Sequence, residues 1–385
     1  MRAVDRTALP VAEPAAVRPA RPTRPARPAL SAWRRWATAF YLTIRVSALG
    51  FTLVLPLVGA VSRGGAIGAW QMAVLMLVAL SFHVFAYVLN DVVDLRLDRS
   101  EPLRADSPLV QGTFGRSQSL ALAWVQLPVA FGLACVAAAS AAALGMLLVA
   151  FAAMAAYNLY GKRCRWPVFT DAVQAIGWCA LLGMGAAWHG LPWNARVEYG
   201  PVWPTFTGWI AAFVFFCVML VQGVHGGLRD LANDQRGGAR TTALWLGARP
   251  GSGSGIVISG AMAGYAVLLQ AALWVTAMAA ASTPPNMAAS AAASMRLLVI
   301  ALLVAASGAL VLAYRRRSER RRLIAAGALN IVCTLLVLPV LVLPSLDLAE
   351  ASALLAALLL PIAAMLAYNG SHWRLSPQSQ PKAAP

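Results

Sequence analysis

The residues best suited to chemistry in this sequence are an amide and three carboxylates at the end of an apolar run. The run is ALSFHVFAYVLNDVVDLRLDR, and it contains Asn90, Asp91, Asp94 and Asp98. At helical periodicity Asn90, Asp94 and Asp98 are spaced i, i+4 and i+8. Asp91 lies i−3 from Asp94, so most of these oxygens share one helix face. We call these four residues the first motif.

A second pair of acids follows a later apolar run, in the segment RDLANDQRG. Asp230 and Asp234 are again spaced i, i+4, and we call them the second motif. The whole chain contains only 14 Asp and Glu residues. Half of them lie in or beside the two motifs: Asp91, Asp94, Asp98, Glu101, Asp106, Asp230 and Asp234.

Carboxylates held this close repel one another unless a cation neutralises them. Hard oxygen ligands suit Mg²⁺, which prefers a few carboxylates together with water and substrate phosphate oxygens. The two motifs therefore predict a Mg²⁺ site that also binds a diphosphate. A simpler interpretation is that the acids only form ion pairs on solvated loops with nearby arginines: Arg96, Arg99, Arg104, Arg229 and Arg236. The presence of two such motifs favours the metal site.

The remainder of the chain has the composition of a multispanning membrane protein. Hydrophobic residues make up 60% of it, charged residues only 12%, and the mean hydropathy is +0.68. These values lie outside the range of soluble globular domains. A net charge of +17 would suit a nucleic-acid-binding protein, but the arginines lie in an N-terminal arm and in short loops between apolar runs. We therefore expect contact with a lipid bilayer and no nucleic-acid partner.

Apolar runs of about 20 residues, the length that spans a bilayer, predict an all-α polytopic membrane bundle of nine to ten transmembrane helices. The expected helices are 37–60, 66–89, 118–138, 140–160, 168–189, 206–227, 254–281, 294–314, 323–344 and 350–368. The sequence does not predict an oligomeric state.

Basic residues give the expected orientation of this bundle. Lys162 and its basic neighbours, the arginines of 229–249 and the block 315–322 all fall on the side of the basic N-terminal arm. The positive-inside rule assigns that side to the cytoplasm, so both termini and both motifs are expected there. The high content of Ala, Arg and Gly is typical of a GC-rich bacterial genome, and we expect a bacterial plasma membrane.

The chain divides into three predicted segments. Residues 1–35 are rich in Ala, Pro and Arg, and such a composition predicts a disordered cytoplasmic arm. Residues 36–370 form one transmembrane domain, and 371–385 form a short cytoplasmic tail.

The first motif resembles the NDxxDxxxD signature of the UbiA-type intramembrane prenyltransferase superfamily. RDLANDQRGGARTTALWLG resembles the DxxxD motif of that family with its Gly-x-x-Thr segment and closing Leu-Gly. Weaker resemblances are Arg45 to a first-helix arginine, SPLVQG to an RPL-x-SG segment and YNLYGKR to a Tyr/Lys motif. The resemblance runs from about Ala37 to Leu343. Ser107 replaces the usual arginine, with Arg104 as its nearest substitute.

The resemblance implies a UbiA-type fold and an enzyme that transfers an isoprenyl group from its diphosphate to an acceptor, expected to be aromatic, with release of pyrophosphate. It implies two Mg²⁺ ions between the motifs, with Asn90, Asp91, Asp94, Asp98, Asp230 and Asp234 as metal ligands. The implied catalytic residues are Asp94, Asp234, Lys162 and Tyr157. The implied substrate-binding residues are Arg45, Arg104, Lys162 and Arg236. Tyr157 and Lys162 are one residue further apart than in the common YxxxK form, which leaves Tyr160 as an alternative tyrosine.

Two other functions remain open. A membrane terpene cyclase would use the same metal-driven ionisation, but the donor's own double bonds would trap the cation. A transporter could bind cations with these acids, although its site would lie near mid-bilayer, whereas both motifs end their apolar runs.

Several further side chains on the same runs could take part in the chemistry, with ordinary packing as the simpler interpretation for each. Aromatic rings could stabilise an allylic cation, and the candidates are Phe82, Phe85, Tyr87, Tyr157, Tyr160, Phe213, Phe215 and Phe216. His83 and His225 lie at comparable places before the two motifs. Either histidine could bind the acceptor or act as a base.

Overall fold

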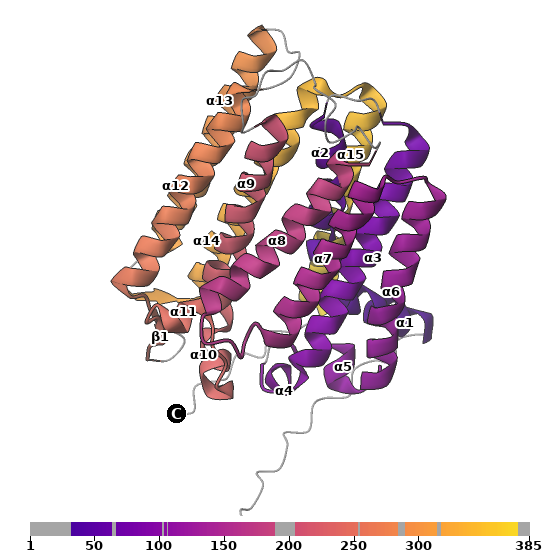
Figure 1. The fold of residues 1–385 in the computed structure, drawn as a ribbon. Coiled ribbons are helices and arrows are strands. Elements are labelled where there is room, and N and C mark those ends of the chain that lie inside the picture. Colours follow the sequence, from indigo (N-terminus) through magenta and orange to yellow (C-terminus); the bar gives the residue numbers. More distant parts are fainter. Residues whose placement is uncertain are drawn as a thin grey trace, which may run out of the picture.

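Long helices form nearly the whole of the computed structural model, which describes residues 32–63, 67–101, 104–105, 107–188, 205–252, 255–283, 289–313 and 317–375. These helices run side by side in one bundle (Figure 1). They are α2 (Val46–Val61), α3 (Ala69–Val93), α6 (Arg116–Val136), α7 (Ala141–Tyr160), α8 (Pro167–Ala186), α9 (Phe206–Met219), α12 (Gly260–Ser282), α13 (Ala289–Ala313), α14 (Arg320–Val342) and α15 (Leu348–Leu375).

Short elements gather at one end of the bundle, the lower end in Figure 1. The short helices there are α1 (Ala32–Thr43), α4 (Leu95–Asp98), α5 (Pro108–Gln111), α10 (Gly227–Gly237) and α11 (Thr242–Trp245). A small antiparallel sheet of order β1-β2-β3 joins β1 (Arg249–Pro250), β2 (Gly255–Val257) and β3 (Arg317–Glu319). A π-helical segment, η2 (Leu220–Gly226), connects α9 to α10, and a 3₁₀ turn, η3 (Leu343–Ser345), follows α14.

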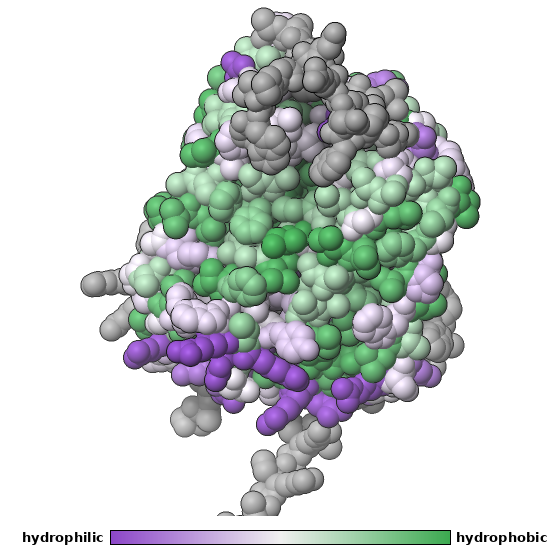
Figure 2. All heavy atoms as spheres, in the orientation of Figure 1, coloured by the Kyte–Doolittle hydropathy of each residue, from purple (hydrophilic) through white to green (hydrophobic). Residues whose placement is uncertain are grey.

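The helices have the length and composition that a bilayer requires. Eight of the described helices are long and apolar enough to cross a membrane, and two more apolar helices, Ala48–Val61 and Leu348–Ala364, are shorter. The surface is apolar over the middle of the bundle, and hydrophilic residues line its lower end (Figure 2). The predicted all-α bundle is confirmed, while the count of nine to ten spanning helices stays a prediction.

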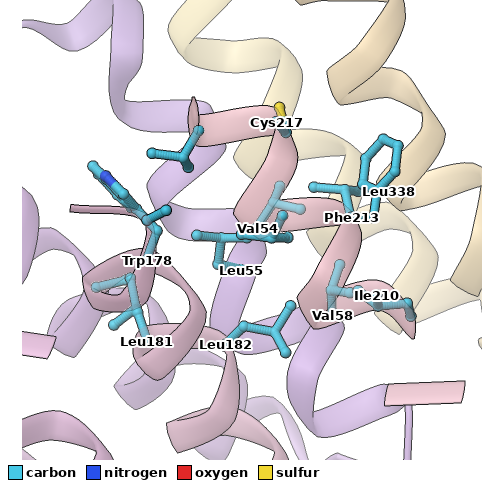
Figure 3. Packing of buried hydrophobic residues seen from close by; sticks show 14 of the residues in the cluster. Val54, Leu55, Val58, Trp178, Leu181, Leu182, Ile210, Phe213, Cys217 and Leu338 are labelled. Carbon is cyan, nitrogen blue, oxygen red and sulfur yellow. The ribbon is translucent and has the colours of Figure 1, made fainter. Parts of the chain in front are cut away.

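The centre of the bundle is an apolar core formed by helices distant in sequence. Figure 3 shows side chains of α2, α8, α9 and α14 meeting there: Val54, Leu55, Val58, Trp178, Leu181, Leu182, Ile210, Phe213, Cys217 and Leu338. The backbones of α2 and α8 touch, because a Cβ on Gly59 would lie 2.0 Å from the carbonyl oxygen of Leu182. A Cβ on Gly185 would lie 1.9 Å from the carbonyl oxygen of Pro56. Small residues permit this close packing, as in other membrane bundles.

The prediction of one continuous helix over 37–60 is wrong. The chain breaks between α1 and α2 at Arg45, whose backbone is left-handed with φ 48° and ψ 57°. The sequence at the break, LTIRVS, contains no glycine or proline, so no local helix-breaking residue predicts it.

The second motif lies on a helix, because η2 and α10 extend the predicted helix 206–227 as far as Gly237. Asp91 likewise lies within α3, so the motifs occupy helix ends rather than loops. The three-stranded sheet was also not predicted. Of the predicted arm, 1–31 lie outside the described residues, and 32–35 are helical. Of the predicted tail, 371–375 belong to α15, and 376–385 lie outside the described residues.

Candidate active site

Lys162 brings the two motifs together. It lies in the turn after α7, and its Nζ is 2.9 Å from Oδ2 of Asp94 and 3.3 Å from Oδ1 of Asp234. Asp94 ends α3, whereas Asp234 lies on α10, so residues from three distant parts of the sequence converge. Both carboxylates are buried. Three residues that the sequence predicted to be catalytic therefore form one cluster.

The carboxylates keep Lys162 charged. Burial lowers the pKa of Lys162, but the neighbouring charges of Asp94 and Asp234 outweigh that effect and raise the pKa above its ordinary value. The ammonium group is therefore a fixed cation between the motifs.

The π-helical segment and its glycines bring α10 close to its neighbours. A Cβ on Gly223 would lie 2.7 Å from Oδ2 of Asp171, and a Cβ on Gly227 would lie 3.0 Å from Cβ of Ala243. A π-turn adds a residue to one helical turn, and such turns are frequent at functional sites. The helix that carries Asp230 therefore continues from α9 through a π-turn and does not end before the second motif.

Asn233, within the second motif's segment, fastens α10 to the end of the first motif. Its Nδ2 donates a hydrogen bond of 3.1 Å to the carbonyl oxygen of Leu97, and its Oδ1 accepts one of 2.8 Å from Ser100. Asn233 is itself buried. The two motifs are therefore linked directly as well as through Lys162, a contact that the sequence analysis missed.

Arg45 contacts the first motif through Asp91. Its guanidinium pairs with Oδ1 of Asp91 and lies 5.1 Å from the ring centroid of Tyr87. Its Nε is buried and has no hydrogen-bond acceptor among the residues that the structure describes. Arg45 therefore presents an unsatisfied donor beside a carboxylate of the first motif.

Two arginines pair with acids of the motifs, as the simpler ion-pair interpretation expects. Arg229 pairs with Asp230 at 2.7 Å, and Arg104 lies 3.9 Å from Asp98. Burial, followed by the charges of Asp91 and Asp94, raises the pKa of Asp98 to about 6 against the opposing effect of Arg104. Pairing therefore does not fully compensate the buried acids.

A small pocket of about 70 Å³ adjoins the second motif. Its wall includes Tyr157, Lys162, Asp171, Asp230, Asp234 and Thr242. Tyr157 thus faces the pocket, whereas Tyr160 is 64% exposed and does not line it. Between the two tyrosines that the sequence left open, the geometry favours Tyr157.

Comparison with known proteins agrees with this geometry. Residues 48–322 match the model of the UbiA prenyltransferase family. The chain belongs to this family. Comparison with curated proteins found no match.

Solved structures show that the family member described here shares the UbiA fold. A UbiA homologue from Aeropyrum pernix K1 has 16% identity and a TM-score of 0.58, over 76% of this chain and 96% of that one. A UbiA homologue from Archaeoglobus fulgidus bound to GPP and Mg²⁺ has 14% identity and a TM-score of 0.54, over 78% and 99%. A digeranylgeranylglyceryl phosphate synthase has 13% identity and a TM-score of 0.53, over 81% and 99%. With its apolar helices, this UbiA family protein is an integral membrane protein.

Some predicted residues of this UbiA family protein lie away from the cluster. Arg236 is exposed, and its Nε donates a hydrogen bond of 3.1 Å to Ala232 in its own helix. Asn90 is half-buried on α3. Phe82 and Phe85 are buried and stack against Phe151, as expected of packing.

The histidines are engaged in hydrogen bonds. His225 Nε2 is 2.9 Å from Oδ1 of Asn330, and Nδ2 of Asn330 donates a hydrogen bond to Oε1 of Gln270. His83 is likewise bonded on both ring nitrogens. These contacts favour a structural part for each.

Other pocket residues were missed by the sequence analysis. Arg240 lines the pocket, and its backbone N–H donates to the carbonyl oxygen of Lys162. Asp171, a buried acid on α8, accepts a hydrogen bond from Thr242. An acid within an apolar helix is a signal of function, so Asp171 could have been found. Thr242 and Arg240 gave no such signal.

The donor groups of this UbiA family protein fit a magnesium ion that is shared with a substrate. In the described part of the chain, no three His, Cys, Asp or Glu side chains are close enough to hold a metal together. Mg²⁺ commonly takes only one or two carboxylates and completes its shell with water and phosphate oxygens. The buried carboxylates of Asp94 and Asp234, both within reach of one Lys162 nitrogen, match that requirement.

Proposed function

We propose that this protein transfers an isoprenyl group from an isoprenyl diphosphate to an acceptor within the membrane, with Mg²⁺ as its cofactor and pyrophosphate as its second product. The observation that carries the proposal is the convergence of Asp94 and Asp234 on Lys162. The UbiA homologue from Archaeoglobus fulgidus, bound to GPP or to DMAPP with Mg²⁺, supports the choice of donor and ion.

Magnesium would be held by oxygen atoms of both motifs, and each ion would take one or two carboxylates and complete its shell with water and diphosphate oxygens. The proposed ligands are Asn90, Asp91, Asp94 and Asp98 from the first motif, and Asp230 and Asp234 from the second. Bound Mg²⁺ supplies positive charge that stabilises the departing pyrophosphate. Arg45 pairs with Asp91 and Arg229 pairs with Asp230, so two of the proposed metal ligands already have a cationic partner.

The chain's own cations would bind the diphosphate oxygens. Lys162 already stands between the motifs, and Arg45 has a free Nε donor beside the first motif. Arg104 stands next to Asp98. Charge-assisted hydrogen bonds from these groups would strengthen as negative charge builds on the leaving oxygen. Arg236 has a weaker claim, because it binds its own helix.

The transfer step breaks the allylic C1–O bond, and both electrons leave with the pyrophosphate oxygen. C1 then forms a bond with a nucleophilic atom of the acceptor, which we propose to be aromatic, and the acceptor loses a proton. Tyr157, which lines the pocket beside Lys162, would cover the reacting carbon with its ring. The apolar bundle above the motifs would hold the isoprenyl chain away from water.

We also propose that the motifs face the cytoplasm, with the basic arm (1–35) and the tail (371–385) on the same side of a bacterial plasma membrane. The basic side chains at the motif-bearing end of the bundle, among them Lys162, Arg229 and Arg320, support this orientation by the positive-inside rule. The motifs lie at the end of the bundle, which argues against a mid-bilayer transport site.

The experiment is an incubation of the purified protein in detergent with Mg²⁺ and geranyl, farnesyl or geranylgeranyl diphosphate, with and without a panel of aromatic acceptors. We expect pyrophosphate and a prenylated product only when an acceptor is present. A cyclised product from donor alone would identify a terpene cyclase instead. Absence of pyrophosphate release with every donor would contradict both enzymatic functions.

A further inference from the structure

The break between α1 and α2 leaves backbone groups that the bundle must satisfy. The left-handed backbone of Arg45 interrupts the helix. The N–H of Ala48, which in a continuous helix would donate to the carbonyl oxygen of Ile44, donates to that of Arg45 instead. Inside a membrane protein, irregular backbone persists only where protein groups replace the lost hydrogen bonds. The carbonyl oxygen of Ile44 receives such a replacement from His83 of α3.

Both ring nitrogens of His83 are used in this contact. Nε2 is 2.6 Å from the carbonyl oxygen of Ile44, and Nδ1 is 2.7 Å from the hydroxyl oxygen of Thr52 on α2. The arrangement suits the neutral tautomer in which Nε2–H donates to Ile44 and Nδ1 accepts from Thr52. His83 is completely buried, so neither nitrogen is available as a base.

His83 is the first of three residues on α3 that contact the break. His83, Tyr87 and Asp91 are spaced i, i+4 and i+8, and therefore lie along one face of the helix. The rings of His83 and Tyr87 are 4.4 Å apart. Tyr87 lies beneath the Arg45 guanidinium, and Asp91 pairs with it. His83 thus contacts the backbone at the break, whereas Tyr87 and Asp91 contact the side chain of Arg45.

We propose that His83 is a positioning residue that acts through Arg45. By fixing the break between α1 and α2, it sets the guanidinium beside Asp91, with its Nε donor available to a diphosphate oxygen. This inference rests on the proposed function, since it assigns Arg45 to the diphosphate. It replaces the earlier expectation that His83 binds the acceptor or acts as a base.

A double-mutant cycle tests the proposal, with the Kd of geranyl diphosphate measured by calorimetry in Mg²⁺. Charge-assisted hydrogen bonds are worth about a tenfold change in affinity or more, so we expect His83→Phe and Arg45→Gln each to weaken binding at least about tenfold. In the Arg45→Gln background, His83→Phe should cause little further loss. His83→Gln should retain most of the affinity, because its amide can donate to Ile44 and accept from Thr52.

Full additivity of the two substitutions, or unchanged affinity in His83→Phe, would overturn the proposal. If His83→Phe does not fold, Thr52→Val replaces it in the cycle, with a smaller loss expected and the same non-additivity required. The wild-type protein separates the two claims. Failure of the wild type to bind geranyl, farnesyl and geranylgeranyl diphosphate alike would overturn the proposed function and this inference together, whereas binding with an additive cycle would overturn the inference alone.

Discussion

Ser100 donates a hydrogen bond of 2.8 Å to the side-chain oxygen of Asn233, and this contact links the segments that carry the two motifs. Ser100 follows the first motif, and Asn233 lies between the two acids of the second. The amide of Asn233 also binds the carbonyl oxygen of Leu97. Two sets of contacts therefore fix the separation of the two motifs: the hydrogen bonds of Asn233 and the ion pairs of Lys162.

Replacement of Asn233 should loosen this link. In Asn233→Ala both hydrogen bonds are lost, so we expect about 1–3 kcal/mol of destabilisation and a higher Mg²⁺ concentration for half-maximal activity. Thermal unfolding in detergent and a Mg²⁺ titration of activity measure the two effects. Gln235→Ala, at an exposed position of the same helix, is the matched control. An unchanged Mg²⁺ requirement in Asn233→Ala would show that the link does not set the motif spacing.

A methyl group at Gly223 should disturb the pocket. Its Cβ would lie 2.7 Å from Oδ2 of Asp171, which is held by Thr242, so Gly223→Ala must displace that hydrogen-bonded pair. We expect about 1–3 kcal/mol of destabilisation together with a loss of activity. Gly264→Ala serves as the control, since a Cβ there meets nothing within 4 Å. Equal activity of the two variants would contradict the described packing of η2 against α8.

The contact between α2 and α8 should tolerate no added atom. In Gly185→Ala the new Cβ would overlap the carbonyl oxygen of Pro56 at 1.9 Å, and a backbone atom cannot rotate away. We expect a poor yield of folded protein or a strongly lowered unfolding temperature. Gly183→Ala on the same helix should behave like wild type, because its Cβ would meet only the flexible side chain of Met146, with the sulfur at 3.4 Å and Cγ at 3.7 Å. A stable Gly185→Ala protein would mean that the two helices are further apart.

Arg320 should matter to stability although it lies in a block of basic residues. Its Nη2 pairs with the buried Glu101 at 3.1 Å, and its Nε donates to the carbonyl oxygen of Arg229 at 2.9 Å. Arg320→Gln would remove the charged partner of the buried Glu101 carboxylate that lies at 3.1 Å, and we expect about 1–3 kcal/mol of destabilisation. Arg322→Gln, whose side chain is 79% exposed, should change the unfolding temperature little. Equal unfolding temperatures of the two variants would show that the contacts of Arg320 do not stabilise the fold.

Much of the site could be predicted because its acidic residues recur at short, regular intervals in the sequence. The i, i+4 repeats of Asp94 with Asp98 and of Asp230 with Asp234 are visible without a fold, and scarcity of acids elsewhere makes them prominent. Resemblance to the family added Lys162 and Tyr157. The apolar runs similarly predicted most helices to within a few residues, because membrane-spanning length is a strong constraint.

The remaining features depend on contacts between distant segments. The break at Arg45 is stabilised by His83 and Asp91, which belong to another helix. The sequence around Arg45 therefore predicts one continuous helix. The hydrogen bond from Thr242 to Asp171 joins α11 to α8, and the π-turn at Gly223 packs against Asp171 of α8, so both features likewise depend on distant segments. No periodicity in the chain carries that information.

The central claim is that Asp94 and Asp234 act as one metal-diphosphate site. The most direct test is the rate of Mg²⁺-dependent pyrophosphate release by the wild type, Asp94→Asn, Asp234→Asn and the double variant, with Glu319→Gln as an exposed control from the same end of the bundle. We expect a loss of about a hundredfold or more in each single variant, little further loss in the double variant, and a normal rate in the control. Wild-type rates in either single variant, or losses that multiply in the double variant, would contradict the central claim.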